Sequence, residues 1–293
     1  MNQTKDGRRR GPRDGARAQA AAPESHGDGP EGDAPLPEGR PSFRFGRRQR
    51  LYRGAPPDPN IPYIACIGGE RSFGRGADAP WPERLGRRLD FQVVNFGVEG
   101  AGPGFFLADS GVLDACDGAA HCVMELCGAW NLSNRYYSVG RRYNRRLRGV
   151  SDHMRELYHD VRLEEFQLVG KLMDALHAHD PDRFALVEEE ARAAWVARTR
   201  ALLEAIEAPV TLLWFGHRRP SEDLRPDPAR PRTLPPEAVT QGMVEAVLPF
   251  SAGYAEIVFE RPADGGRPRA APTDAMHERI AEAAQRATAP LLT

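Results

Sequence analysis

Hydrophobic residues along this chain gather in short runs that alternate with segments of helical spacing. Each run is five or six residues long, which is typical of strands buried on both faces of a sheet. The predicted strands are 63–67, 91–95, 122–126, 210–215 and 254–259.

Segments with apolar residues at helical spacing lie between these runs. In the longest, Phe184, Val187, Ala191 and Trp195 share one face, which indicates core packing. Strands that alternate with helices imply a parallel sheet covered on both sides. We therefore predict an α/β fold, a three-layer α/β/α sandwich of flavodoxin-like type, over residues 61–293. The predicted helices are 81–89, 104–116, 151–158, 164–177, 183–206, 236–248 and 273–289.

Residues 1–60 have a different composition, rich in Arg, Pro and Gly. Within the first fifty residues the large apolar side chains are Met1, Leu36, Phe43 and Phe45. So few apolar groups bury too little surface to offset the entropy of ordering the chain. We predict a disordered tail, whose basic clusters are more typical of a solvated segment than of a contact with an acidic partner.

Charge and hydropathy exclude several classes of protein. The net charge of −1 argues against nucleic acid as a partner, and the mean hydropathy of −0.55 predicts no membrane-spanning helix and no membrane partner. The four cysteines form no C-x-x-C pair and are expected to be free thiols in a reducing compartment. Because no apolar stretch follows the basic start, no secretory signal is expected, and the predicted location is the cytoplasm.

Ligands of parallel sheets bind at the carboxyl ends of the strands, so the residues that follow each predicted strand are the candidates for a site. The first turn reads Gly68-Gly69-Glu70, and a hydroxyl follows at Ser72. The residues of interest after the later strands are Asn95, Gly100, Asn131, Asp274 and His277.

The order of these turns resembles the SGNH (GDSL-like) hydrolase superfamily over roughly residues 62–289. Asn95 and Gly100 match its second block, and Asn131 approximates the third with one extra residue. Asp274 and His277 match the Asp-x-x-His of its last block. Segments 133–137 and 194–198 also resemble an uncharacterised bacterial family of SGNH-like proteins without an assigned function.

The resemblance implies roles for these residues. His277 would be the base and Asp274 the group that orients it, while Gly100 and Asn131 would supply oxyanion donors. Alternatively, Asp274 or its neighbour Thr273 caps the last helix and His277 lies on its surface. Gly100 would then serve a tight turn, and Asn131 would cap a loop.

The first block departs from the family. Setting Gly68 on the family's glycine places Glu70 at the serine position, and a carboxylate cannot replace a serine alkoxide in ordinary ester hydrolysis. Ser72 is the nearest hydroxyl and a candidate nucleophile. Alternatively, Glu70 would activate water together with His277. Gly68 itself is equally well explained by a turn that needs a positive φ angle.

An arginine-rich segment, residues 128–149, contains no acidic residue. Guanidinium groups bind phosphate, sulfate or carboxylate in a bidentate way, so this segment is a candidate anion clamp. The alternative is a solvated helix, or ion pairs with acids such as Glu188–Glu190. The candidate substrate-binding residues are Asn134, Arg135, Tyr136, Arg141 and Arg142.

The sequence thus favours a hydrolase, an esterase or carbohydrate O-deacylase acting on an anionic small molecule or carbohydrate ester. A non-catalytic anion- or carbohydrate-binding module, or a sulfuryl or acyl transferase, are the alternatives. No metal site and no cofactor are expected, because metal-ligand spacing, a Walker A loop and the Rossmann glycine pattern are missing.

Overall fold

The computed structural model describes residues 39–47, 49–222, 238–260 and 273–292. Its main sheet has five strands, all parallel, in the order β4-β3-β5-β8-β9. The predicted α/β sandwich is confirmed, and each predicted strand is present with a shift of at most one residue at either end. The strands are β3 (Tyr63–Ile67), β4 (Gln92–Asn95), β5 (His121–Glu125), β8 (Val210–Gly216) and β9 (Gly253–Val258).

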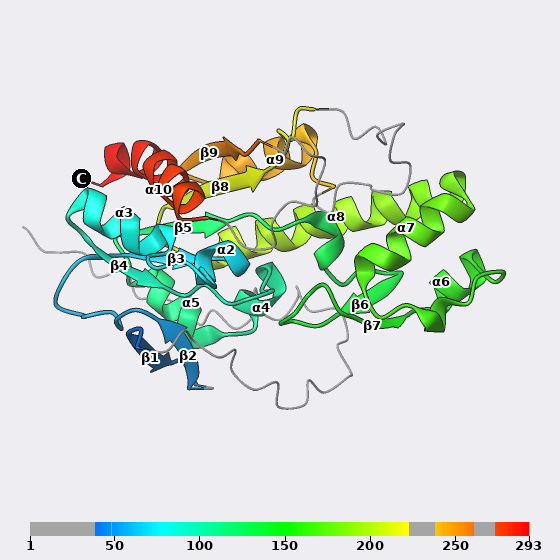
Figure 1. The fold of residues 1–293 in the computed structure, drawn as a ribbon, viewed down its shortest axis with the longest axis horizontal. Coiled ribbons are helices and arrows are strands. Elements are labelled where there is room, and N and C mark those ends of the chain that lie inside the picture. Colours follow the sequence, from blue (N-terminus) through cyan, green and yellow to red (C-terminus); the bar gives the residue numbers. More distant parts are fainter. Residues whose placement is uncertain (1–38, 48, 223–237, 261–272, 293) are drawn as a thin grey trace, which may run out of the picture.

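The two faces of the sheet bury alternate residues of each strand. Ile64 and Cys66 of β3 pack in the cluster under α3 (Trp81–Leu89) and α10 (Asp274–Thr288). Ala65 and Ile67 belong to the larger cluster on the other face. Helices α5 (Ser110–Asp117), α8 (Pro181–Ala205) and α9 (Gln241–Val247) contribute to this larger cluster. Helices therefore cover both faces, as Figure 1 shows.

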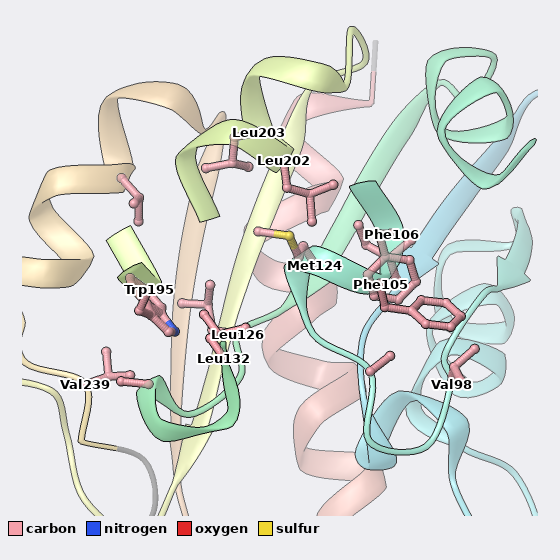
Figure 2. Packing of buried hydrophobic residues seen from close by; sticks show 14 of the residues in the cluster. Val98, Phe105, Phe106, Met124, Leu126, Leu132, Trp195, Leu202, Leu203 and Val239 are labelled. Atoms are coloured by element: carbon pink, nitrogen blue, oxygen red, sulfur yellow. The ribbon is translucent and has the colours of Figure 1, made fainter. Parts of the chain in front are cut away.

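The long helix α8 follows the stripe predicted from the sequence. It begins two residues earlier than expected because Pro181 occupies its first turn and the Asp180 side chain accepts hydrogen bonds from the amides of the next turn. Trp195, Leu202 and Leu203 of α8 face Met124 and its neighbours (Figure 2). The Trp195 indole donates to the Cys127 carbonyl at 2.8 Å.

Three predicted helices differ from the structure by more than one or two residues at their ends. Segment 104–116 is two helices, α4 (Pro103–Leu107) and α5, because the Asp109 side chain accepts from the Val112 amide and starts a new helix. Segment 164–177 is a 3₁₀ turn, η2 (Leu163–Glu165), followed by α7 (Val169–His179). In segment 236–248, residues 236 and 237 lie outside the described residues, and α9 begins only at Gln241. The other elements are α6 (Asp152–Leu157), η3 (Leu248–Phe250) and η4 (Ala289–Leu291).

Part of the segment predicted to be disordered is folded, so the boundary at residue 60 is wrong. Strands β1 (Ser42–Phe45) and β2 (Arg50–Arg53) pair antiparallel. Phe43 and Tyr52 are buried, and their rings lie 6.1 and 5.3 Å from that of Phe96. A few well-placed aromatic side chains therefore suffice to dock a short hairpin on a domain that already exists. Residues 1–38 lie outside the described residues.

The arginine-rich segment is neither a helix nor a simple loop. It begins with a 3₁₀ turn, η1 (Ala129–Asn131), and continues as two antiparallel strands, β6 (Tyr137–Val139) and β7 (Leu147–Val150). This small hairpin lies beside α6 and α7 (Figure 1).

Candidate functional site

The candidate site lies where the strand order changes direction. From β3 the chain moves to β4 on one side, and later to β5 on the other. In open parallel sheets the crevice outside the carboxyl ends of the two strands at such a point is the usual place for a ligand. Here those ends carry the Gly68-Gly69 turn, which leads into the short helix α2 (Glu70–Phe73), and Glu125.

The Glu125 side chain accepts several hydrogen bonds from the turn that contains Ser72. One carboxylate oxygen of Glu125, Oε2, accepts from the Ser72 hydroxyl at 2.6 Å and from the Ser72 and Gly69 amides at 2.9 Å each. Ser72 is completely buried. The Glu125 carboxylate therefore engages two backbone amides of this turn as well as its hydroxyl.

Gly68 allows this contact by lacking a side chain. A Cβ at this position would lie 2.3 Å from the Ser72 Oγ and 2.5 Å from the Glu125 Cβ, closer than side chains approach. Close approach, and not a positive φ angle, therefore explains this glycine, because Gly68 is not among the positive-φ glycines.

Glu70, which takes the serine position in the resemblance to SGNH hydrolases, lies nearby and pairs with an arginine. Its carboxylate accepts from Arg145 of the arginine-rich segment at 3.0 Å. Burial raises the pKa of Glu70, and the charges of Glu125 and Glu99 act in the same direction, while Arg145 opposes them. Three carboxylates thus share this edge of the sheet, and no group of three metal-ligating side chains is found among the described residues.

Asn95 and Gly100 shape the neighbouring loop. The Asn95 amide donates to the Ser72 carbonyl at 2.8 Å and accepts from the Gly97 amide at 2.8 Å, which fixes the two turns together. Gly100 has a φ of +69°, and a Cβ there would lie 2.7 Å from the backbone of Tyr143. Its carbonyl accepts from the Asn144 amide at 3.1 Å. Gly100 is thus where the arginine-rich segment docks on the loop.

Asn131 lies in η1 and is half-exposed. Its backbone amide donates to the Gly128 carbonyl at 3.3 Å, and its side chain makes no hydrogen bond to the described residues.

His277 and Asp274 share the first turn of α10 but have different partners. The Nδ1 of His277, a fully buried side chain, accepts from the Trp81 amide at 3.3 Å, and its Nε2 has no partner among the described residues. Burial, with the positive charge of Arg84 next in importance, lowers the pKa of His277 to about 4. The Asp274 carboxylate is half-exposed and accepts from Arg84 at 2.5 Å.

The structure therefore does not bring the four candidate catalytic residues together by hydrogen bonds. No bond links His277 to Asp274, Ser72 or Glu70 within the described part of the chain. Thr273 caps helix α10, as the alternative interpretation expects, because its hydroxyl accepts from the Met276 amide at 3.3 Å. The surface position that this alternative gave to His277 is not observed, since the ring is buried.

The candidate clamp residues are largely engaged with the protein. Arg135 lies over the Tyr136 ring at 5.1 Å and pairs with Glu190 at 3.6 Å, as the ion-pair alternative expects. The Asn134 side chain accepts from the Tyr136 amide at 2.9 Å. Arg142 is buried and lies over the Tyr143 ring at 4.9 Å, while its neighbour Arg141 is half-exposed.

A small cavity of about 10 Å³ adjoins the Ser72–Glu125 contact. Phe106, Met124 and Leu202 supply apolar walls (Figure 2). Thr199 also lines it, and its buried hydroxyl has no partner among the described residues. A cavity of this size has room for about one water-sized group.

Sequence reasoning missed Glu125 and Thr199. Glu125 is the single acid in the run CVMEL, and a charged residue at the carboxyl end of an otherwise apolar strand was a usable signal. Thr199 gave no signal, because a threonine on the buried face of a helix usually bonds a carbonyl of the preceding turn.

No helix in the described residues is long and apolar enough to span a membrane.

Comparisons with known proteins identify a family but no activity. One structural neighbour is a carbohydrate esterase family 2 enzyme with a carbohydrate-binding domain from Myceliophthora fergusii (TM-score 0.41, 14% identity, 83% of this chain and 70% of that chain). Another is a lipolytic protein of the G-D-S-L family from Desulfitobacterium hafniense (TM-score 0.34, 14% identity, 76% and 98%). These likenesses are too distant to assign an activity, and no curated protein matches the chain.

Residues 37–291, which include the β1–β2 hairpin, match the family described as a domain of unknown function, DUF6473. The chain therefore belongs to the DUF6473 family.

Proposed function

We propose that this chain is a small-molecule binding module whose site lies at the carboxyl ends of β3 and β5 and which carries out no acyl transfer. The observation that supports this proposal is the position of the Glu125 carboxylate. It accepts from the Gly69 and Ser72 amides and from the Ser72 hydroxyl, so the candidate nucleophile and the amides of its turn already bond to a group of the protein itself.

The histidine supports the same conclusion. A general base must reach the proton that it removes and needs a pKa near the working pH. The Nδ1 of His277 is engaged with the Trp81 amide, and its pKa is lowered to about 4 by burial. Asp274, the residue expected to orient it, is paired with Arg84 instead.

Ester hydrolysis is the second candidate, and one contact favours it. The Ser72 hydroxyl donates to Glu125 at 2.6 Å, so this carboxylate is placed to take the proton as Oγ attacks an ester carbonyl. The alkoxide leaving group would then depart with a proton, and water would release the acid from the acyl-serine. For the turn amides to stabilise the oxyanion, Glu125 would first have to leave them.

Hydrolysis of short-chain aryl esters separates the two candidates. The binding module predicts that wild type turns over no faster than Ser72→Ala. Turnover that is lost in Ser72→Ala and in Glu125→Gln, with both variants folded by near-UV circular dichroism, would establish the hydrolase. His277→Gln serves as the matched control, because a loss there as well would instead support the histidine base that the family resemblance implies.

A further inference from the structure

Thr199 of helix α8 carries a buried hydroxyl that has no hydrogen-bond partner among the described residues. Thr211 is buried to the same extent, but its hydroxyl lies 2.8 Å from a ring nitrogen of His121 and is hydrogen-bonded to it. An unbonded hydroxyl in the protein interior costs free energy, so buried hydroxyls usually pair with a protein group or with ordered water. Because no described residue pairs with Thr199, its hydroxyl requires a small partner from solvent.

The cavity beside Thr199 has room for such a partner. Its volume of about 10 Å³ is close to the minimum that holds one water molecule. Thr199, Glu125 and Ala101 all line it. Phe106 and Leu202 supply apolar walls (Figure 2). Such walls do not solvate a charge, so the cavity favours a neutral molecule over a cation.

Two oxygen acceptors of the lining residues are also unused. The three hydrogen bonds that the Glu125 carboxylate accepts all go to Oε2, which leaves Oε1 without a donor among the described residues. The Ala101 carbonyl likewise accepts from no described residue. A Cβ on Gly69 would stand 3.7 Å from Glu125 Oε1 and 3.3 Å from the Ala101 oxygen, so the two acceptors lie on the same side of this turn. A buried water needs roughly two to four polar partners, and these oxygens together with the Thr199 hydroxyl supply that number.

We propose that this cavity binds one water molecule, which links the Thr199 hydroxyl to the Glu125 carboxylate. The water accepts from Thr199 Oγ1 and donates to Glu125 Oε1 and to the Ala101 carbonyl, so each of these groups gains a partner. Thr199 is thereby a positioning residue of the candidate site, because it acts on Glu125 through the water. The proposal goes beyond the binding function proposed above, since the bridge holds Glu125 in place whichever ligand or reaction the site serves.

A high-resolution crystal structure of the full chain tests the bridge directly. We expect a water oxygen within hydrogen-bond distance of both Thr199 Oγ1 and the Glu125 carboxylate. A cavity that holds no water, or a Thr199 hydroxyl that donates to the Trp195 carbonyl one turn earlier in α8, would overturn the proposal.

The stability of Thr199→Val separates a bridged hydroxyl from an unbonded one. Valine keeps the branched shape of the side chain and removes its hydrogen bond to the water. We expect the unfolded-to-folded ratio, extrapolated to water from urea denaturation, to rise about fivefold to tenfold. A hydroxyl that bonds nothing predicts the opposite sign, because a methyl group in its place carries no desolvation penalty. An unchanged or lower ratio would therefore contradict the bridge.

A double-mutant cycle shows whether Thr199 acts on Glu125. Thr199→Val and Glu125→Ala should depart from additivity by about threefold or more in the same ratio, because each removes one end of a shared bridge. Thr199→Ser keeps the hydroxyl, so its effect should add to that of Glu125→Ala. Additive effects of Thr199→Val and Glu125→Ala would remove the positioning role from Thr199.

Thr288 of helix α10 provides the matched control for this cycle. Its hydroxyl is also buried without a partner among the described residues, but Thr288 does not line the cavity, and α10 covers the other face of the sheet from α8. Thr288→Val should therefore be additive with Glu125→Ala. The same departure from additivity for Thr288→Val as for Thr199→Val would mean that the coupling does not pass through the cavity.

An ammonium ion is the competing occupant, because it is about as large as water and would pair with the charge of Glu125. A neutral water predicts that the urea midpoint of wild type is the same in ammonium chloride as in sodium chloride of equal concentration. A higher midpoint in ammonium chloride that disappears in Glu125→Gln would identify a cation site and overturn the assignment to water.

Discussion

Two polar groups beside the same sheet, the half-buried Glu125 carboxylate and the buried His277 ring, contrast in how completely they are hydrogen-bonded. The Oε2 of Glu125 accepts three bonds from residues of one turn, whereas His277 uses Nδ1 once and leaves Nε2 without a partner in the described residues. A carboxylate oxygen that accepts from three donors holds the donating residues in place. A poorly bonded imidazole in an apolar cluster stays neutral, because its charged form is not solvated. The more fully hydrogen-bonded polar group is therefore Glu125, and not the histidine that the resemblance to SGNH hydrolases singles out.

The largest effect is expected at Gly68. Gly68→Ala places a Cβ 2.3 Å from the Ser72 Oγ, so the Glu125 contact must move apart. We expect a loss of about 3 kcal/mol in the free energy of unfolding by urea denaturation, at the upper end for overpacking. Gly170→Ala is the control, since nothing lies within 4 Å of its Cβ, and it should stabilise helix α7 slightly. Similar results for both variants would contradict the crowding argument.

Removing the carboxylate comes next. Glu125→Ala leaves the Ser72 hydroxyl and two amides without their acceptor, and should cost about 2–3 kcal/mol in the same assay. Glu125→Gln keeps an acceptor oxygen and should cost less. If Glu125→Ala is as stable as wild type, the three bonds are not what holds the turn.

His277 should make the free energy of unfolding depend on pH. The pKa of His277 is about 4 in the folded state and 6.5 as a free side chain, so the unfolded state binds more protons between these values. The contribution of neutral His277 to the free energy of unfolding is therefore complete above pH 6.5 and is lost as pH falls towards 4. From pH 7 to pH 5 this one group should cost about 2 kcal/mol.

His277→Gln, which can still accept from Trp81, should remove that part of the pH dependence in urea denaturation at several pH values. His121 also has its pKa lowered to about 4 by burial, so its share of the pH dependence remains in the variant. An unchanged slope would mean that His277 titrates normally.

The smallest effect is expected at Asp274. Its ion pair with Arg84 is half-exposed, and such pairs contribute less than about 1 kcal/mol. Asp274→Asn should therefore leave the urea midpoint and the pH profile close to wild type. A pH profile shifted as strongly as in His277→Gln would show that Asp274 governs the histidine after all.

The sequence predicted the sheet because each of its strands is a short, mostly apolar run. It predicted the site less well, for reasons visible at particular residues. Ser72 and Glu125 are 53 positions apart, and their pairing depends on the order of β3 and β5 in the sheet, which no local pattern encodes. Asp274 and His277 have the family's spacing, but the packing of α10 against α3 turns one towards Arg84 and the other into the core.

The N-terminal hairpin was missed for a related reason. Phe43 and Tyr52 are isolated aromatic residues in a polar stretch, and they become core residues only where Phe96 receives them. For the arginine-rich segment the sequence left an anion clamp and ion pairs with nearby acids as alternatives, and the structure pairs Arg135 with Glu190 and Arg145 with Glu70.

Arg53 links the β1–β2 hairpin to the loop beside the candidate site. Its buried guanidinium donates to the carbonyls of Gly74, Ala77 and Asp78, in the loop that follows the Ser72 turn. Hairpin and turn should therefore open together, as one cooperative unit in amide hydrogen exchange. Removal of residues up to 60 would leave these carbonyls without the Arg53 donor, so the β1–β2 hairpin supports a turn that lies more than fifteen positions further along the chain.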